Sequence, residues 1–438
     1  MNKGSRFFII VPALCLALGF AMPVINGVVL EKFVMDHLGG KKGLAGIEIL
    51  EYDRGFFSSR ILWKLKSGQV DALAGKGEVI FLDRADHGLL EVRSRTSLDK
   101  NQWFKAFSDR HLNGMAPFDM ETRYSVLGRV ESRMSVKGFS FDSPRGKTDI
   151  KPGRAEISWD KKKGIRGEWT WGGGHFPGHL VSGAMTGDLT FRKAKDRIWD
   201  GRFFVRADRL ETWHQPLSFE GLCLVFESDF DPKKNLVDFL VQSGFDRMVS
   251  GQDRIGDGFA GLEMGNVDAN GYQWVTGAYG GAMVKAFSDI VSGPHDPRAV
   301  YHRIGQLGEQ MGFGFLSQCE RLLKTNLRIR VAGLKARIDS GENKGQVRGE
   351  LALTLKRNMT LAGFIPIMLR PAAILDMFDF SSRASLPPGF EKSNPYLVSP
   401  LGRGMETGLF VLDTGGLSHK LETIQGKLFL NNRQVKLE

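Results

Sequence analysis

Cysteine is scarce in this chain, which has three among 438 residues: Cys15, Cys223 and Cys319. Cys15 lies in an apolar N-terminal run, so Cys223 and Cys319 are the one pair that could form a disulfide elsewhere. A chain of this length buries a large core without needing a cross-link. We therefore expect Cys223 and Cys319 to be buried free thiols.

The sequence also lacks the short signatures of common catalytic and cofactor sites. It contains no His-Glu-x-x-His and no Cys-x-x-Cys, the usual zinc-site patterns. It has no Gly-x-Ser-x-Gly elbow to carry a serine nucleophile. The glycine run 172–174 is followed by His, Phe and Pro, which is not the strand–loop–helix context of a phosphate loop. We expect no metal, no cofactor and no catalytic residue, and we predict that the protein is not an enzyme.

What the sequence does contain is an unbroken run of 24 uncharged residues, Phe7–Leu30. As a helix it would extend roughly 36 Å, enough to cross a hydrocarbon core of about 30 Å. Lys3 and Arg6 precede the run, and the positive-inside tendency then keeps residues 1–6 in the cytoplasm. We predict a transmembrane anchor over residues 7–30. The alternative is a signal peptide cut near Gly19 or Ala21, and both interpretations export the remainder of the chain.

The charge of the chain limits its partners. The formal charge is +11, and it falls to +9 without Lys3 and Arg6. A basic surplus suits anionic lipid headgroups or an acidic protein partner, whereas export argues against nucleic acid. The longest basic run is Lys161–Lys163, which we expect to be a solvated turn rather than a binding patch.

Alternation with a period of two dominates residues 31–438. From Tyr124 to Val136, apolar residues share one face and charged residues take the other, with Leu127 as the exception. The same pattern recurs at residues 327–331 and 346–356. One-sided alternation is typical of antiparallel sheets with a buried face and a wet face. The region 124–136 is therefore predicted to be a single strand.

Helical periodicity interrupts the strands near residues 273–323. Asp296 is a candidate N-cap followed by Pro297, and apolar residues then recur every three or four positions to Leu322. A second helix is predicted over Trp274–Val291 and a short third one from Pro371 to about Phe380. No linker, repeat or low-complexity tract divides the chain. The predicted fold class is thus β-rich α+β: a large antiparallel sheet structure, a few packed helices and one N-terminal transmembrane helix.

Two stretches are more distinctive than composition. The segment Glu51–Ser59 reads EYDRGFFSS and is followed by Asp86-His87-Gly88, while Gly426–Asn431 lies in a C-terminal pair of strands. Together with the apolar run, this order resembles the YdgA family of bacterial envelope proteins, a domain family of unknown function. The resemblance implies an inner-membrane anchor, a periplasmic β-rich body and no established catalytic residues.

The candidate motif residues come from the two distinctive stretches: Tyr52, Arg54, Gly55, Ser58, Ser59, Asp86, His87 and Gly88. The first stretch is predicted to be a hairpin, with Gly55 supplying a positive φ at the turn. Asp86 and His87 could form a general-base pair. The alternative, which we favour, is a strand-ending turn with a partly exposed His87.

Three functions are compatible with these features. The first is a non-catalytic, membrane-tethered periplasmic protein that binds an apolar or lipid ligand, or an envelope protein. The second is an envelope hydrolase that uses Asp86 and His87, which requires a Ser, Thr or water near His87 in space. The third is a structural homo-oligomer. An apolar sheet face left open would favour lipid binding, and a filled one would favour a scaffold.

Overall fold

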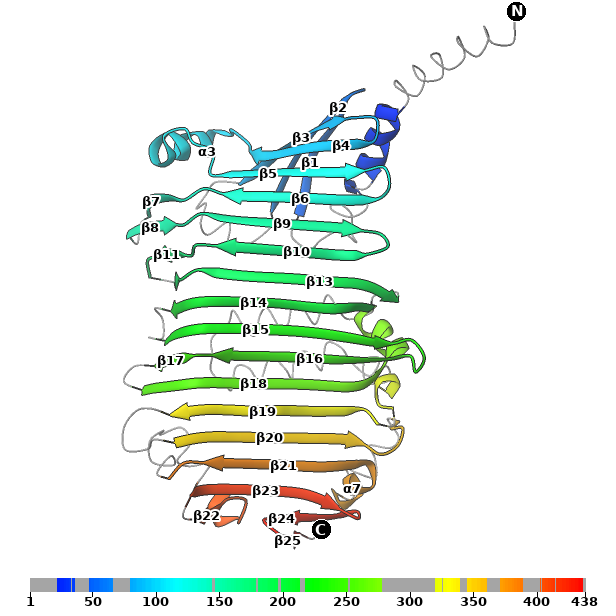
Figure 1. The fold of residues 1–438 in the computed structure, drawn as a ribbon, viewed down its shortest axis with the longest axis vertical. Coiled ribbons are helices and arrows are strands. Elements are labelled where there is room, and N and C mark those ends of the chain that lie inside the picture. The colour runs from blue at the N-terminus through cyan, green and yellow to red at the C-terminus, as the bar shows by residue number, and fades with distance from the viewer. Residues whose placement is uncertain are drawn as a thin grey trace, which may run out of the picture. The chain divides into compact units, whose positions relative to one another are not determined.

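The structure, a computed structural model, describes residues 22–32, 34–35, 47–65, 79–143, 146–178, 180–195, 198–212, 217–250, 253–277, 320–324, 326–338, 345–360, 371–388, 402, 404–413 and 415–435. The chain divides into two compact units, Met1–Thr190 (unit 1) and Phe191–Glu438 (unit 2). Each unit is built on an antiparallel sheet with few helices (Figure 1). The predicted β-rich class with antiparallel sheet structure is confirmed.

In unit 1 the strands pair antiparallel in the order β1-β2-β3-β4-β5-β6-β9-β10-β13, and β7, β8, β11 and β12 pair alongside. Helix α3 (Gln102–Phe107) and the π-helical turn η2 (Ser108–Leu112) lie between β4 and β5. The strands are β1 (Ile47–Arg54), β2 (Ser58–Leu65), β3 (Ile80–His87), β4 (Glu91–Leu98), β5 (Phe118–Ser125), β6 (Arg129–Val136), β7 (Phe139–Ser143), β8 (Gly146–Ile150), β9 (Gly153–Asp160), β10 (Gly164–Trp171), β11 (Gly174–Phe176), β12 (Leu180–Ser182) and β13 (Met185–Lys195).

Hairpin turns alternate between the two ends of this sheet, as the antiparallel order requires. Residues 55–57, 88–90, 126–128 and 161–163 form the turns at one end, which we call the turn end. Backbone hydrogen bonds join neighbouring turns there, from His87 N to Phe57 O (2.7 Å) and from Val126 N to Leu90 O (3.1 Å). The turn end is therefore a continuous structural feature of unit 1.

The prediction of a single strand over residues 124–136 is wrong. This segment forms a hairpin, in which β5 ends at Ser125 and β6 begins at Arg129. Gly128 adopts a φ of +79° in the turn, a conformation that favours glycine. Leu127, the residue that broke the alternation, is 89% exposed at its tip.

Residues 22–32 form a helix that packs on the sheet of unit 1. Leu30 and Val34 share a buried core with Ile61, Ala85 and Val92. Residues 7–21 of the predicted membrane span lie outside the described residues, and Leu30 at its end contacts protein. Among the residues that the structure describes, no helix is long and apolar enough to cross a membrane.

Unit 2 continues the same hairpin pattern, with β14, β15, β16, β18, β19, β20, β21, β23, β24 and β25 paired antiparallel in that order. Strands β19 and β20 confirm the alternation at residues 327–331 and 346–356. The strands are β14 (Ile198–Thr212), β15 (Leu217–Asp231), β16 (Leu236–Phe245), β17 (Arg247–Ser250), β18 (Asp253–Asp268), β19 (Arg328–Ile338), β20 (Gly345–Leu355), β21 (Phe378–Leu386), β22 (Val411–Asp413), β23 (Gly416–Ile424), β24 (Lys427–Leu430) and β25 (Arg433–Val435).

The helices of unit 2 differ in extent from those predicted. A helix covers residues 269–277, and the rest of the second predicted helix lies outside the described residues. Of the helix predicted from Asp296, only residues 320–322 are described, as helical. Near Pro371 a 3₁₀ turn, η3 (Pro371–Ala373), leads into α7 (Ile374–Met377), and Phe378 already starts β21. Cys223 is a free, half-buried thiol, and Cys319 lies outside the described residues.

Candidate functional site

The two distinctive stretches meet in space as a buried Ser–His pair. Ser59 on β2 and His87 on β3 are 4% and 5% exposed, and the Ser59 Oγ lies 2.9 Å from the His87 Nε2. The hydroxyl of Tyr52, on β1, donates to the same Oγ at 3.3 Å. Because these residues share one face of adjacent strands, the alternation that buries Ile61 and Ala85 also brings their polar atoms together.

The surroundings of His87 favour its neutral form. Burial lowers its pKa, an effect that outweighs the raising influence of the Phe56 backbone and of Asp86. The hydrogen bond between the Ser59 Oγ and the His87 Nε2 takes its donor from the ring tautomer. Within the described residues the buried Nδ1 has no hydrogen-bond partner. A Cβ added to Gly27 would lie 2.5 Å from the His87 Cε1, so helix 22–32 passes directly against the ring.

The alternative Asp86–His87 general-base pair does not form, and β3 ends at His87, as the favoured strand-ending turn requires. Successive strand residues point to opposite faces, and Asp86 is exposed while His87 is buried. The prediction of a partly exposed His87 is also wrong, because His87 occupies an inward position of β3 and is buried. Arg54 pairs with Glu31 of helix 22–32 at 2.6 Å, and Ser58 lies opposite Asp86 on the exposed face.

Two glycines of the motif serve close approach rather than a left-handed turn. The hairpin at Gly55 is confirmed, but its φ is not positive. Its N–H donates to the Ser58 carbonyl at 2.8 Å, and a Cβ would lie 3.1 Å from that oxygen. At Gly88 a Cβ would lie 2.7 Å from the Glu91 carbonyl oxygen. Both positions therefore resist side chains because backbone lies in the way.

A buried carboxyl lies deeper on the same face, and the sequence prediction missed it. Asp83 accepts a hydrogen bond from the Ser94 hydroxyl, and burial raises its pKa to about 6. Tyr124 lies close to it, and its pKa is raised by burial and then by the charges of Asp83 and Tyr52. The signal was present in the alternation, because Asp83 occupies an inward position between Phe81 and Ala85.

We call Tyr52, Ser59, Asp83, His87 and Ser94 the polar cluster. Helix 22–32 passes against its His87 and is held to the sheet by further polar contacts. Asn26 donates to the Gly88 carbonyl at 2.7 Å, and Glu31 pairs with Arg54. No described group of three or more His, Cys, Asp or Glu side chains is placed to hold a metal ion. Among the described residues no carboxylate forms a hydrogen bond with the His87 ring, so the described arrangement is a Ser–His pair without the carboxylate of a catalytic triad.

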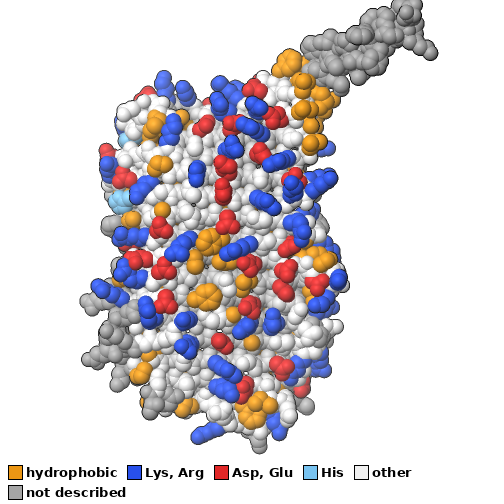
Figure 2. Space-filling view, in the orientation of Figure 1, with side chains coloured by type: hydrophobic (Ala, Val, Ile, Leu, Met, Phe, Trp, Pro, Cys, Tyr) orange, Lys and Arg blue, Asp and Glu red, His pale blue; other side chains and the backbone are white. Residues whose placement is uncertain are grey.

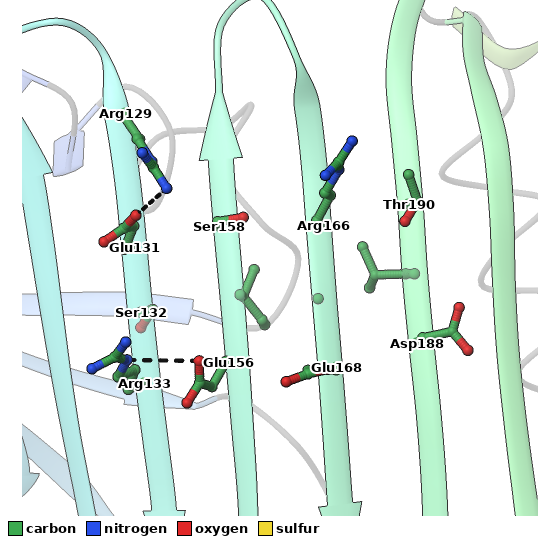
Figure 3. A pocket seen from close by; sticks show the side chains of 13 residues that line it. Arg129, Glu131, Ser132, Arg133, Glu156, Ser158, Arg166, Glu168, Asp188 and Thr190 are labelled. Atoms are coloured by element: carbon green, nitrogen blue, oxygen red, sulfur yellow. Dashed lines mark ion pairs between the residues drawn. The ribbon is translucent and has the colours of Figure 1, made fainter.

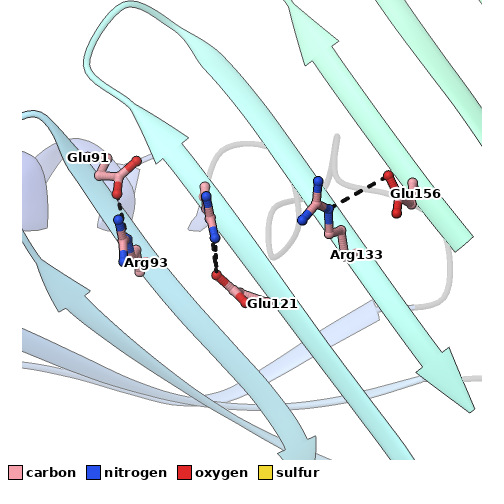
Figure 4. Close-up of polar contacts among 6 residues, drawn as sticks. Glu91, Arg93, Glu121, Arg133 and Glu156 are labelled. Carbon is pink, nitrogen blue, oxygen red and sulfur yellow. Dashed lines mark hydrogen bonds and ion pairs between the residues drawn. The ribbon is translucent and has the colours of Figure 1, made fainter.

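The opposite face of unit 1 is charged and carries a shallow hollow of about 480 Å³. Figure 3 shows its side chains projecting from β6, β9, β10 and β13, with an ion pair between Arg133 and Glu156 at 3.7 Å and another between Arg129 and Glu131. Similar pairs, Glu91–Arg93 and Glu121–Arg123, continue across β4 and β5 (Figure 4). Exposed pairs of this kind contribute little stability. The face is therefore a solvated surface with balanced charge.

In unit 2 the apolar face of the sheet changes from filled to open along the strands. On β16, Val237 is fully buried whereas Val241 is 36% exposed. On β18, Val267 is 2% exposed and Leu262 is 40% exposed. On β20, Leu355 is 1% exposed and Leu351 is 45% exposed. All three strands lose burial in the same direction, so the change belongs to the face as a whole.

The filled end of this face is covered by helix 269–277, whose Tyr272 packs on Phe239 with ring centroids 4.9 Å apart. The open end forms a continuous row, because Val241 pairs with Leu262, Leu262 with Val331 and Val331 with Leu351. Leu224 and Leu334 extend the exposed set. We call these side chains, Leu224, Val241, Leu262, Val331, Leu334 and Leu351, the apolar row.

Comparison with known proteins gives a family but no characterised relative. No curated protein and no solved structure matches the chain. Residues 1–385 match a family described as bacterial proteins of unknown function (DUF945). The match includes the polar cluster, helix 22–32 and the apolar row. The chain therefore belongs to this bacterial family of unknown function, DUF945.

Proposed function

We propose that the protein binds lipid, with an acyl chain lying along the apolar row of unit 2. The observation that carries the proposal is the loss of burial from Val237 to Val241, repeated on β18 and β20. Folded proteins rarely leave aligned apolar side chains in water without a partner. The row crosses β15, β16, β18, β19 and β20, a span of about 19 Å at the usual strand spacing. This length exceeds one leaflet of a hydrocarbon core, about 15 Å, so an extended acyl chain fits it.

The opposite side of the same strands carries exposed ion pairs, together with Phe259, which is 39% exposed. Arg202 pairs with Glu227 at 3.4 Å, and Arg330 pairs with Glu263 at 3.7 Å. A sheet with ion pairs on one face and one partly uncovered apolar face separates a lipid tail from water on one side only. Because the exposed side chains form a narrow row rather than a broad patch, an acyl chain suits it better than a second protein surface does.

The lipids that co-purify with the full chain test this proposal. Extraction in mild detergent followed by mass spectrometry is expected to recover phospholipid or fatty acid in stoichiometric amounts. Protein that carries no lipid above the detergent background would refute lipid binding and favour a scaffold for an envelope protein.

We further propose that the uncharged run predicted as an anchor, residues 7–30, tethers the protein to the bacterial inner membrane, with the body in the periplasm. The uncharged run and the preceding Lys3 and Arg6 support this arrangement. Protease added to intact spheroplasts is expected to digest the body, and protection of the body would contradict it.

A second candidate function rests on the Ser59–His87 contact. A serine hydroxyl hydrogen-bonded to an imidazole is the arrangement that activates a nucleophile when the imidazole accepts the proton. Hydrolysis would require helix 22–32 to move, because both residues are buried. A fluorophosphonate probe that labels the full chain, but not its Ser59→Ala variant, would support a hydrolase. An absence of labelling in detergent and in vesicles would dismiss it.

A further inference from the structure

The turn end of unit 1 presents large apolar side chains to solvent. Three of its four hairpin turns carry an adjacent exposed pair: Phe56 and Phe57, Leu89 and Leu90, and Val126 and Leu127. Leu90 is 72% exposed and Leu127 is 89% exposed. Hairpin tips usually carry small or polar residues. The shared end and the repeated pairs make these tips one surface rather than three separate exceptions.

Helix 22–32 adds its outer face to this surface. Ile25, Val28 and Val29 are exposed while Leu30 is buried against the sheet. Asn26 fixes the helix to the second apolar tip by donating to the carbonyls of Gly88 (2.7 Å) and Leu89 (3.3 Å). Figure 2 shows hydrophobic side chains gathered at the corner of unit 1 where this helix lies. The helix and the tips thus form a continuous apolar end.

The fourth turn at this end is basic. Lys161, Lys162 and Lys163 are all exposed, and none of them forms an ion pair with a described side chain. The Asp160 carboxylate accepts from the backbone N–H groups of Lys162 (2.8 Å) and Lys163 (3.0 Å), which shapes the turn. The exposed lysine side chains lie beside the Val126–Leu127 tip, because β6 pairs with β9, and Asp160 at the start of the turn attracts Lys163.

We propose that the turn end of unit 1 docks on an anionic lipid bilayer, with the apolar tips entering the interface and Lys161–Lys163 contacting headgroups. Apolar side chains bordered by lysines are the composition of interfacial membrane-binding surfaces. The chain itself supports a bilayer as the occupant, because the uncharged residues 7–21 immediately precede helix 22–32 at this end. The inference is independent of acyl-chain binding by unit 2.

This surface alters the interpretation of the lysine run, which sequence composition alone assigned to a solvated turn. Each lysine near an anionic surface favours binding by about fivefold, so the three together favour docking by roughly 100-fold. Salt screens such contacts over about 10 Å at moderate ionic strength. Docking is therefore expected to depend on both anionic lipid and salt.

Labelled full-length protein in vesicles tests the docking. Leu127→Cys, in a chain whose native cysteines are replaced by serine, carries an environment-sensitive fluorophore at the most exposed tip. Ala116→Cys is the matched control, because it is exposed where the chain enters the opposite end of β5. The vesicles contain phosphatidylcholine with or without phosphatidylglycerol, and nitroxide lipids serve as quenchers.

With phosphatidylglycerol, quenching is expected at position 127 and not at position 116. Replacing Lys161, Lys162 and Lys163 by glutamate is expected to weaken docking on these vesicles by roughly 100-fold or more. Circular dichroism melts confirm that each variant is folded. Equal quenching at both positions, or none at position 127 in either vesicle, would overturn the proposal. Cross-linking between copies at position 127 without lipid quenching would overturn it in favour of a second copy as the partner.

Discussion

Replacing the exposed side chains of the apolar row by serine tests the proposed lipid binding. We consider Val241→Ser, Leu262→Ser and Leu351→Ser in one variant. These side chains are 36%, 40% and 45% exposed and pair in register through Val331. In the proposed lipid-bound state an acyl chain covers the exposed parts of these side chains, whereas in the free protein water covers them.

The expected loss follows from the uncovered area. The three exposed portions amount to about one whole aliphatic side chain, and burial of such a side chain contributes about 2 kcal/mol. A loss of about 2 kcal/mol corresponds to roughly 30-fold weaker lipid binding. The portions already buried are replaced by smaller polar groups, so some loss of folding stability accompanies the change.

Lipid occupancy, measured by mass spectrometry of the purified full chain, is the assay. The matched control replaces the neighbours that lie on the other face, Gln242, Glu263 and Ala352, by serine. We expect the control to retain lipid and the apolar-row variant to lose it. Equal occupancy in a folded apolar-row variant would refute the reasoning, because it would show that the row does not contact the lipid.

Three further substitutions test the contact of helix 22–32, the raised pKa of Asp83 and the filled end of the apolar face. Gly27→Ala places a methyl group 2.5 Å from the His87 Cε1, so we expect the free energy of unfolding in urea to fall by about 1–3 kcal/mol. The control Val29→Ala, on the exposed side of the helix, should change it by no more than about 0.5 kcal/mol. Equal losses would contradict the packing of Gly27 on His87. Asp83→Asn is expected to stabilise the protein above pH 6 by up to about 3 kcal/mol, because the pKa of Asp83 is about 6 in the folded state and 3.8 in the unfolded state. This gain in stability should vanish as the pH falls from about 6 to about 4. A gain that grows on acidification would exclude a raised pKa. Leu355→Ala, at the filled end of the apolar face, is expected to lower the free energy of unfolding by about 2–5 kcal/mol, while the folded fraction retains its lipid. Loss of lipid without loss of stability would reverse our assignment of the filled and open ends.

Period-two alternation was sufficient to predict the sheet class and strands β19 and β20, and the turn residues around Gly55 predicted the hairpin at residues 52–59. It failed at residues 124–136, where Val126 and Gly128 fit the same period although they form a turn. The turn has three residues, so the strand residues that flank it, Ser125 and Arg129, are four positions apart and the period of two continues through the turn. Leu127, the one residue out of phase, was the available signal.

The polar cluster shows why sequence adjacency misleads within a strand. Asp86 and His87 are neighbours in sequence, and strand geometry places them on opposite faces. The partner of His87 is Ser59, 28 positions away on β2, and only the strand pairing brings the two together. The inward position of Asp83 could have been predicted from the same alternation.

The decrease in side-chain burial along the apolar face of unit 2 could not be predicted from the sequence. Val237 and Val241 follow the same inward period, yet one is buried and the other exposed. The difference depends on where helix 269–277 packs, since its Tyr272 covers Phe239 and not the row beyond. An alternating pattern describes a filled face and an open face equally well.

The most direct test of lipid binding places a photo-cross-linking amino acid at position 262 of the full chain in living cells. Leu262 lies in the middle of the apolar row, and the next residue, Glu263, faces the opposite side of the sheet, where it pairs with Arg330. We predict that irradiation attaches lipid at position 262 and not at position 263. Attachment of protein alone at position 262, or equal lipid attachment at both positions, would contradict the account.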